Sequence, residues 1–318
     1  MLRSLLAAVA LSSGAASAAA AYPDRPVALV TPYAAGGPAD VVARSLARAL
    51  EQRLGQPVVV ENKPGGGASI GTGFVARAKP DGYTLLLGTS AGHVVTPLMQ
   101  KTVYDGVKGF AFCSVVAVQP IMLVVNPSRG IRSVPELIAR AKAEPGKWSY
   151  GSAGVGGATH LGAELFRERA GVDIVHIPYS GAAPAINDLV GGQVDMAVLN
   201  LAASLQFIRS GRLKALAYAN DHRSPLLPDV PTLAESGVKG AESASWYSLA
   251  APKGTPPEVL ERLNDAVAKV NANPEYSKLM QAQGVDLWNM TPQEATAFVE
   301  KDQAAMRKLV QAAGLMKK

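Results

Sequence analysis

Short apolar runs alternate with amphipathic segments along most of the chain, and this alternation predicts an α/β protein. The runs 27–31, 57–61 and 83–87 are mostly apolar, which is typical of strands buried on both faces of a sheet. Residues 41–50 and 161–169 instead place apolar side chains at helical spacing. Because strands and helices alternate throughout, we expect largely parallel sheets covered by helices.

Two apolar segments are predicted to connect one domain with another. Residues 121–125 follow a break near residues 119–120, and residues 243–251 bring the chain back later. A chain of 318 residues is long enough for two domains. We therefore expect a ligand cleft between two domains, where strand ends converge. The expected boundaries are 22–123 plus 246–318 for the first domain and 124–245 for the second.

Four loops rich in glycine, serine and alanine lie where a predicted strand runs into a predicted helix. These four corners are residues 33–40, 88–93, 151–160 and 178–186. At such a corner, free backbone N–H groups converge at the positive end of a helix dipole, which favours an anion. No Lys or Arg occurs between Pro32 and Val42. An anion at the first corner would therefore be held by backbone donors, although a tight turn that binds nothing has the same sequence.

The second corner also matches the G-x-S-x-G pattern of serine hydrolases. In that interpretation Ser90 is the nucleophile, with Asp188 or Asp195 as the acid and His222 as the base. A five-residue match with two free positions is weak evidence, because small residues are common wherever a loop approaches a ligand. We therefore favour Ser90 as a hydrogen-bond donor to a bound anion, with an exported hydrolase as the alternative.

The first 21 residues have the pattern of a secretory signal. Arg3 precedes a short apolar core at residues 5–11, and a tract of small residues at 16–21 offers several cleavage positions between Ala18 and Ala21. The apolar core is too short to span a membrane. We expect an exported protein in a bacterial periplasm.

Composition argues against several other classes of protein. The formal net charge is +6, but the basic residues are scattered, so nucleic-acid binding is not expected. Cys113 is the only cysteine and lies in an apolar run, which predicts a buried packing residue and no intramolecular disulfide. The four histidines have no metal-ligand spacing, so neither a metal nor a cofactor is expected.

A series of ordered motifs resembles the Bug, or TctC-like, family of periplasmic solute receptors of tripartite tricarboxylate transporters. The resemblance spans essentially all of the chain after the signal. It is carried by residues 22–26, 32–37 with Asp40, 61–65, 80–85, 150–152, 178–181, 191–194, 227–232 and 251–256. It implies a two-domain Venus-flytrap fold of type II-like topology, with two mostly parallel sheets joined by two crossing strands.

The resemblance also implies a binding site in which main-chain amides hold a carboxylate deep in the cleft. Asp40 either fixes its loop or receives a polar group of the ligand, and His160 either touches the ligand or has a capping or packing role. The implied ligand contacts are Tyr33, Ala35, Gly36, Gly37, Asp40, Thr89, Ser90, Ser152, Ala153, Gly154, Gly156, Thr159, His160, Ser180, Gly181, Ala185 and Asn200.

By this resemblance the protein is a monomeric receptor and not an enzyme. It would capture a small organic carboxylate and deliver it to membrane permease subunits by a hinge motion of two domains. A receptor that signals to a sensor kinase is the alternative, because both roles need the same closed, liganded state. Backbone donors specify only a carboxylate, so the sequence does not distinguish among dicarboxylates, tricarboxylates, amino acids and aromatic acids.

Overall fold

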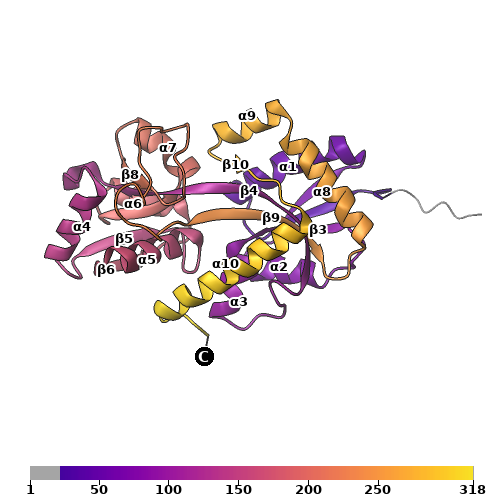
Figure 1. The fold of residues 1–318 in the computed structure, drawn as a ribbon, viewed down its shortest axis with the longest axis horizontal. Coiled ribbons are helices and arrows are strands. Elements are labelled where there is room, and N and C mark those ends of the chain that lie inside the picture. Colours follow the sequence, from indigo (N-terminus) through magenta and orange to yellow (C-terminus); the bar gives the residue numbers. More distant parts are fainter. Residues whose placement is uncertain (1–21, 318) are drawn as a thin grey trace, which may run out of the picture.

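The computed structural model describes residues 22–317, so the predicted signal at residues 1–21 lies outside the described part of the chain. Figure 1 shows two bodies of helices and strands, connected by two long strands that cross from one body to the other. These strands are β4 (Phe110–Val125) and β9 (Ala244–Pro252). They pair with each other antiparallel at the centre of the strand order β2-β1-β3-β9-β4-β7-β5-β6.

The first domain is built on a sheet whose outer strands are parallel. Strand β1 pairs parallel with both β2 and β3, while β9 joins β3 antiparallel and the short β10 joins β4 antiparallel. The elements are β1 (Val27–Thr31), α1 (Pro38–Leu54), β2 (Val58–Asn62), α2 (Ser69–Ala76), β3 (Thr84–Thr89), the π-helical η1 (Ala91–Val95), α3 (Thr96–Met99), α8 (Pro257–Asn271), α9 (Pro274–Ala282), β10 (Asp286–Leu287) and α10 (Pro292–Ala312).

The second domain repeats this plan around the far end of β4. Strand β5 pairs parallel with β6 and β7, while β4 pairs antiparallel with β7 and β8. The elements are the 3₁₀ turn η2 (Pro127–Arg129), α4 (Val134–Ala143), β5 (Trp148–Ser152), α5 (Ala158–Ala170), β6 (Ile174–Pro178), α6 (Ala182–Val190), β7 (Met196–Asn200), α7 (Leu201–Arg209) and β8 (Lys214–Tyr218).

This arrangement has the expected α/β, two-domain organisation, with antiparallel pairs wherever a crossing strand joins a sheet. The predicted break near residues 119–120 is wrong, because β4 runs through Gln119 and Pro120 without interruption. Pro120 lies where β4 leaves its partner β9 and takes up β7 one residue later. A residue without an N–H group is tolerated at such an end of a ladder. The predicted boundaries at 123/124 and 245/246 fall inside β4 and β9, and they stay a prediction.

Apolar clusters cover both faces of each sheet. In the first domain, one cluster joins β1 and β3 to α1 and α8, and another joins the opposite face to η1 and α10. Cys113 is fully buried in the first of these clusters, and burial raises the pKa of its thiol to about 12. The packing role predicted for Cys113 is therefore confirmed.

Gly88 allows close packing of β3 against η1. His93 is fully buried beside it, with Nδ1 2.6 Å from the carbonyl oxygen of Gly106 and Nε2 3.1 Å from Ser248 Oγ. A methyl group on Gly88 would overlap the imidazole of His93 and lie 2.7 Å from Ser248 Oγ. No side chain is therefore accommodated at this position without displacing a buried hydrogen-bonded ring.

We expect Gly88→Ala to lower the free energy of unfolding by about 1–3 kcal/mol, because overpacking a rigid core forces its neighbours to shift. Urea denaturation of the ligand-free protein measures this loss. Gly181→Ala is the matched control, since a methyl group there meets nothing within 4 Å and the backbone is extended. Equal stability of the two variants would contradict the close packing seen at Gly88.

Candidate functional site

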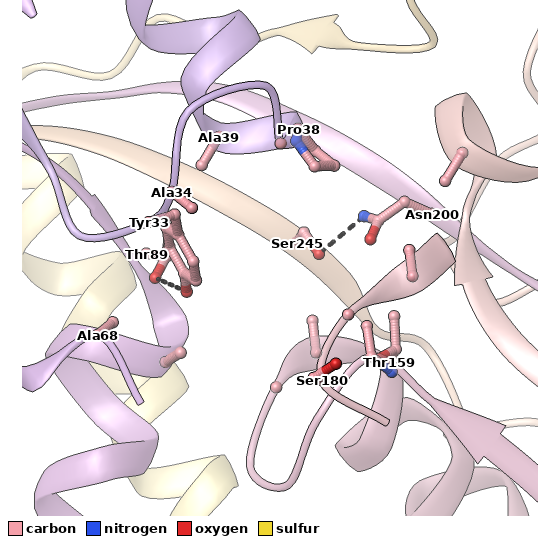
Figure 2. A pocket seen from close by; sticks show the side chains of 18 of the residues that line it. Tyr33, Ala34, Pro38, Ala39, Ala68, Thr89, Thr159, Ser180, Asn200 and Ser245 are labelled. Carbon is pink, nitrogen blue, oxygen red and sulfur yellow. Dashed lines mark hydrogen bonds between the residues drawn. The ribbon is translucent and has the colours of Figure 1, made fainter. Parts of the chain in front are cut away.

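A pocket of about 850 Å³ lies between the two domains. Its walls come from loops that follow β1, β2 and β3 in the first domain and β5, β6 and β7 in the second, and β9 adds Ser245, Trp246 and Tyr247. Figure 2 shows Tyr33 and Ala34 facing Thr159, Ser180 and Asn200 across it. Among the described residues, none that lines the pocket carries a charged side chain.

Eleven of the seventeen predicted contact residues line this pocket. They are Tyr33, Ala35, Gly36, Gly37, Thr89, Ser90, Ala153, Thr159, Ser180, Gly181 and Asn200. The other six, Asp40, Ser152, Gly154, Gly156, His160 and Ala185, lie outside the lining. All four corners predicted from the sequence thus meet at one place, while some predicted contacts of the first, third and fourth corners lie outside the lining. A ligand contact by any of these residues stays a prediction.

Asp40 holds the first corner in place from behind. Its carboxylate accepts hydrogen bonds from the amide of Gly36 at 2.9 Å, from Arg44 Nε at 2.9 Å and from Asn62 Nδ2 at 2.8 Å. Burial alone would raise the pKa of Asp40, but these hydrogen bonds outweigh it and hold the pKa below its usual range. Of the two roles considered for Asp40, fixing its loop or receiving a polar group of the ligand, these contacts correspond to the first.

Tyr33 presents its ring to the pocket from the same corner. Its hydroxyl lies 3.0 Å from Thr89 Oγ1, and its carbonyl oxygen accepts a hydrogen bond from Asn62. Figure 2 marks the Tyr33–Thr89 contact with a dashed line. Because Tyr33 is fixed at both its backbone and its side chain, it forms a rigid part of the wall.

Free backbone donors remain at the first and fourth corners, which face each other across the pocket. Within residues 22–317, no acceptor is found for the amides of Ala34, Ala35 and Gly37, or for the four consecutive amides of residues 180–183 at the start of α6. Backbone amides away from water normally have a hydrogen-bond acceptor. Amides without one in the protein are therefore available to a bound anion. The positive end of the α6 dipole strengthens this preference.

Four amides of the third corner are used within the loop, whereas those of Ala158 and Thr159, at the start of α5, have no acceptor among residues 22–317. The amide of Ala153 donates to Thr159 Oγ1 at 3.0 Å, and the amide of Gly154 donates to Ser152 Oγ at 3.3 Å. The amide of Gly156 donates to His160 Nδ1 at 3.1 Å. The sequence predicted four equivalent corners, whereas in the structure the loop of the third corner is internally hydrogen-bonded and its free pocket-lining donors are those at the start of α5.

Ser90 is not part of a hydrolase triad in this structure. Its hydroxyl donates to Asp302 Oδ2 at 2.9 Å, and that oxygen also accepts from Trp246 Nε1 at 3.0 Å. The proposed triad partners are engaged elsewhere: Asp188 with Tyr179, Asp195 with Ser149, and His222 with Asp221 and Asp286. Burial raises the pKa of Asp302, although the hydrogen bonds from Ser90 and Trp246 oppose this shift.

Several lining residues were missed from the sequence. The glycine run after β2 contributes Pro64, Gly65, Gly67 and Ala68, and α7 contributes Ala203 and Phe207. The glycine run has the same strand–loop–helix pattern as the four corners, so it could have been included with them. Phe207 has no such signal, because an aromatic residue two turns into an amphipathic helix is equally typical of a core.

No metal centre accompanies the pocket. Within residues 22–317, no three or more His, Cys, Asp or Glu side chains are arranged to hold a metal ion. In the same part of the chain, no helix has the length and apolar character needed to cross a membrane.

Neutralising Asp40 and neutralising Asp302 should have opposite effects on the free energy of unfolding. We expect Asp40→Asn to lower the free energy of unfolding at pH 7 by about 1.5–3 kcal/mol, the usual value of a charged hydrogen bond. The stabilisation by Asp40 is present above its unfolded pKa and lost as the pH falls through its lowered folded pKa. Urea denaturation of the wild type, Asp40→Asn and Asp302→Asn between pH 3 and pH 8 measures these effects.

We expect Asp302→Asn to keep or raise stability at pH 7, because its pKa is raised and the charged form is disfavoured by burial. One amide oxygen still accepts from Ser90 and Trp246, and the difference from the wild type should vanish at pH values where Asp302 is protonated. Similar losses from Asp40→Asn and Asp302→Asn at pH 7 would contradict this assignment.

Known proteins match this chain over most of its length, in sequence and in structure. BugT of Bordetella pertussis is 39% identical over 280 residues, covering 87% of this chain and 86% of BugT. The periplasmic binding protein BugD is 39% identical with a TM-score of 0.81, over 93% of this chain and 100% of that one. A protein of R. palustris solved with adipate is 35% identical with a TM-score of 0.84, over 92% and 98% of the two chains. The family model described as "Tripartite tricarboxylate transporter family receptor" matches residues 42–315, and the chain belongs to this family of periplasmic solute-binding proteins.

Proposed function

We propose that this protein is a periplasmic receptor that binds a small organic carboxylate in the pocket between its domains. The observation that carries the proposal is that free backbone amides face each other across a pocket without charged side chains. They are the amides of Ala34, Ala35 and Gly37 in the first domain and those of residues 180–183 in the second. Hydrogen bonds to a charged group contribute about 1.5–3 kcal/mol each. Three or four of them supply much of the roughly 8 kcal/mol that micromolar binding requires.

The chemistry of the walls favours a carboxylate whose body carries no ammonium group. An ammonium is bound best by a carboxylate, and the lining of the pocket has none, since Asp40 and Asp302 lie outside it. Asp40 already accepts three hydrogen bonds and Asp302 two. The remaining wall is largely apolar, with Phe207, Ile186 and many alanines. An uncharged carbon chain or ring is therefore the best match for the space beside the amides.

Membership of the receptor family supports delivery of the bound carboxylate to membrane permease subunits of a tripartite tricarboxylate-type transporter. The two crossing strands β4 and β9 would act as the hinge about which the domains close on the ligand. Loss of the gene should then abolish uptake of the carboxylate that the purified protein binds, and plasmid-borne wild-type protein should restore it. Unchanged uptake in the deletion strain would contradict the transport role.

Matched ligand pairs test the proposed ligand class. We expect adipate, succinate or an aromatic dicarboxylate to raise the Tm of the refolded protein by a few degrees at 100-fold over Kd, where binding adds about 2.7 kcal/mol. We expect 2-aminoadipate and aspartate, which differ from adipate and succinate only by an ammonium group, to give at least tenfold weaker binding. Equal affinity within a pair would contradict the predicted exclusion, and silence across the panel would contradict the receptor function.

A steric block tests the location of the site. Ala203 lies on the pocket wall at the start of α7. We expect Ala203→Trp to abolish the ligand-induced rise in Tm, because the indole fills the space beside the free amides. The Tm of this variant without ligand should stay near that of the wild type. Ala272→Trp, an exposed change at the end of α8, is the control that should keep full binding. Full binding by Ala203→Trp would place the ligand elsewhere.

A further inference from the structure

Two imidazole rings are stacked beneath the third corner. His160 lies in the first turn of α5 and His176 in β6, and their ring centroids are 4.0 Å apart with planes inclined by 20°. The ring of Tyr150 in β5 is nearly parallel to both, with its centroid 4.8 Å from that of His176 and 6.5 Å from that of His160. His160 is buried and His176 half-buried. Neither ring lines the pocket, so the ligand site described above does not explain why two histidines are held together here.

Each ring holds one end of the loop above it, residues 152–157, which we name the clamp loop. His160 Nδ1 accepts a hydrogen bond from the amide of Gly156 at 3.1 Å. His176 Nε2 lies 2.7 Å from Ser152 Oγ, and that hydroxyl oxygen also accepts from the amide of Gly154. The two histidines thus fix the first residue of the loop and the glycine near its end.

The clamp loop faces the first domain as well as the pocket. Ala153 and Gly157 line the pocket. A methyl group on Gly156 would lie 2.8 Å from Met99 Sδ and 3.4 Å from Val95, both in the first domain. The backbone at Gly156 has φ of +77°, which favours glycine. The position of this loop therefore affects both the wall of the pocket and the approach of the two domains.

The contact with Gly156 requires a neutral His160, whereas His176 Nε2 can either accept from or donate to Ser152 Oγ. Two protonated rings with centroids 4.0 Å apart would also repel each other. An acceptor Nδ1 on His160 carries no proton, so protonation would replace the Gly156 hydrogen bond by two opposed N–H groups. Burial lowers the pKa of both rings, that of His176 to about 4, and His160 lowers it further. Of the other charged groups around the pair, Glu164 raises both pKa values and Arg167 lowers that of His160. Glu164 is itself paired with Arg167 and with the hydroxyl of Tyr150.

We propose that His160 and His176 are positioning residues that hold the clamp loop in its ligand-binding conformation, and that protonation of this stacked pair releases the loop. The proposal rests on the proposed carboxylate-binding function. It gives the two histidines a role without ligand contact and makes ligand affinity fall at acid pH for a reason that lies in the protein.

Paired substitutions at His160 and His176 distinguish the effect of their hydrogen bonds on ligand binding from the effect of packing alone. His160→Asn keeps an acceptor close to the position of Nδ1, and His176→Gln keeps a polar group close to Nε2, whereas leucine at either position removes it. We expect His160→Leu and His176→Leu to weaken binding of the best carboxylate at least tenfold at pH 7. We expect His160→Asn and His176→Gln to stay within about threefold of wild type. His222→Gln, an exposed histidine of the second domain, is the control and should bind as wild type.

The pH profile tests the release. We expect wild-type affinity to fall more steeply between pH 6 and pH 4 than that of the His160→Asn/His176→Gln double variant, in which neither position titrates. Ligand protonation affects both proteins equally and cancels in the comparison. Identical profiles would overturn the release, and equal losses in the leucine and amide variants at pH 7 would overturn the positioning role.

A measurement without ligand separates this proposal from the proposed function. The Gly156 amide should exchange its hydrogen slowly in wild type and in His160→Asn, and at least tenfold faster in His160→Leu. Thermal unfolding of each variant shows whether the fold persists. If no carboxylate binds to wild type, the receptor function fails while the exchange rates still test the positioning pair. Unchanged exchange in a folded His160→Leu protein would overturn the proposal by itself.

Discussion

The pocket wall has no charged side chain, so the anion that we propose for it has to be held by neutral groups, and the rest of the site follows from that constraint. Backbone N–H groups are weak partners singly, so several must converge, and they must be withheld from the hydrogen bonds that normally consume them. The free amides of Ala34, Ala35 and Gly37 and those of residues 180–183 meet this need from opposite domains. Both groups end a strand and begin a helix, which is the one place where regular structure leaves consecutive donors unpaired.

Rigid loops make such donors effective, and buried polar side chains behind the wall supply the rigidity. Asp40 ties the first corner to Arg44 and Asn62, and Asp302 ties Ser90 and Trp246 to the last helix. The stacked histidines do the same for the third corner. The side chains of Asp40, Asp302, His160 and His176 do not line the pocket. Charge is therefore placed one layer behind the ligand, where it orders the loops without pairing directly with the carboxylate.

The sequence could predict those parts of the arrangement that depend on the pattern of residues within one short segment. Apolar runs locate β1 and β3, and glycine-rich corners after strands locate most of the pocket wall. Contacts between distant segments leave no such pattern. Ser90 and Asp302 are 212 positions apart, and nothing in the sequence of α10 marks Asp302 as a partner of that loop. The stack of His160 on His176 likewise depends on β6 lying beside β5, which is a property of the sheet order.

The crossing strands give the pocket and the hinge common residues. Strand β9 places Ser245, Trp246 and Tyr247 on the pocket wall, and the same three residues pair with β4 at positions 117–119. Asn200 is hydrogen-bonded to Ser245 and to Gln119 of β4, so the second domain is fixed to both strands at the base of the cleft. In the proposed hinge motion, a ligand on this wall would contact the segment about which the domains turn. Occupancy of the pocket and the relative orientation of the domains would then be coupled through these few residues, without a separate relay.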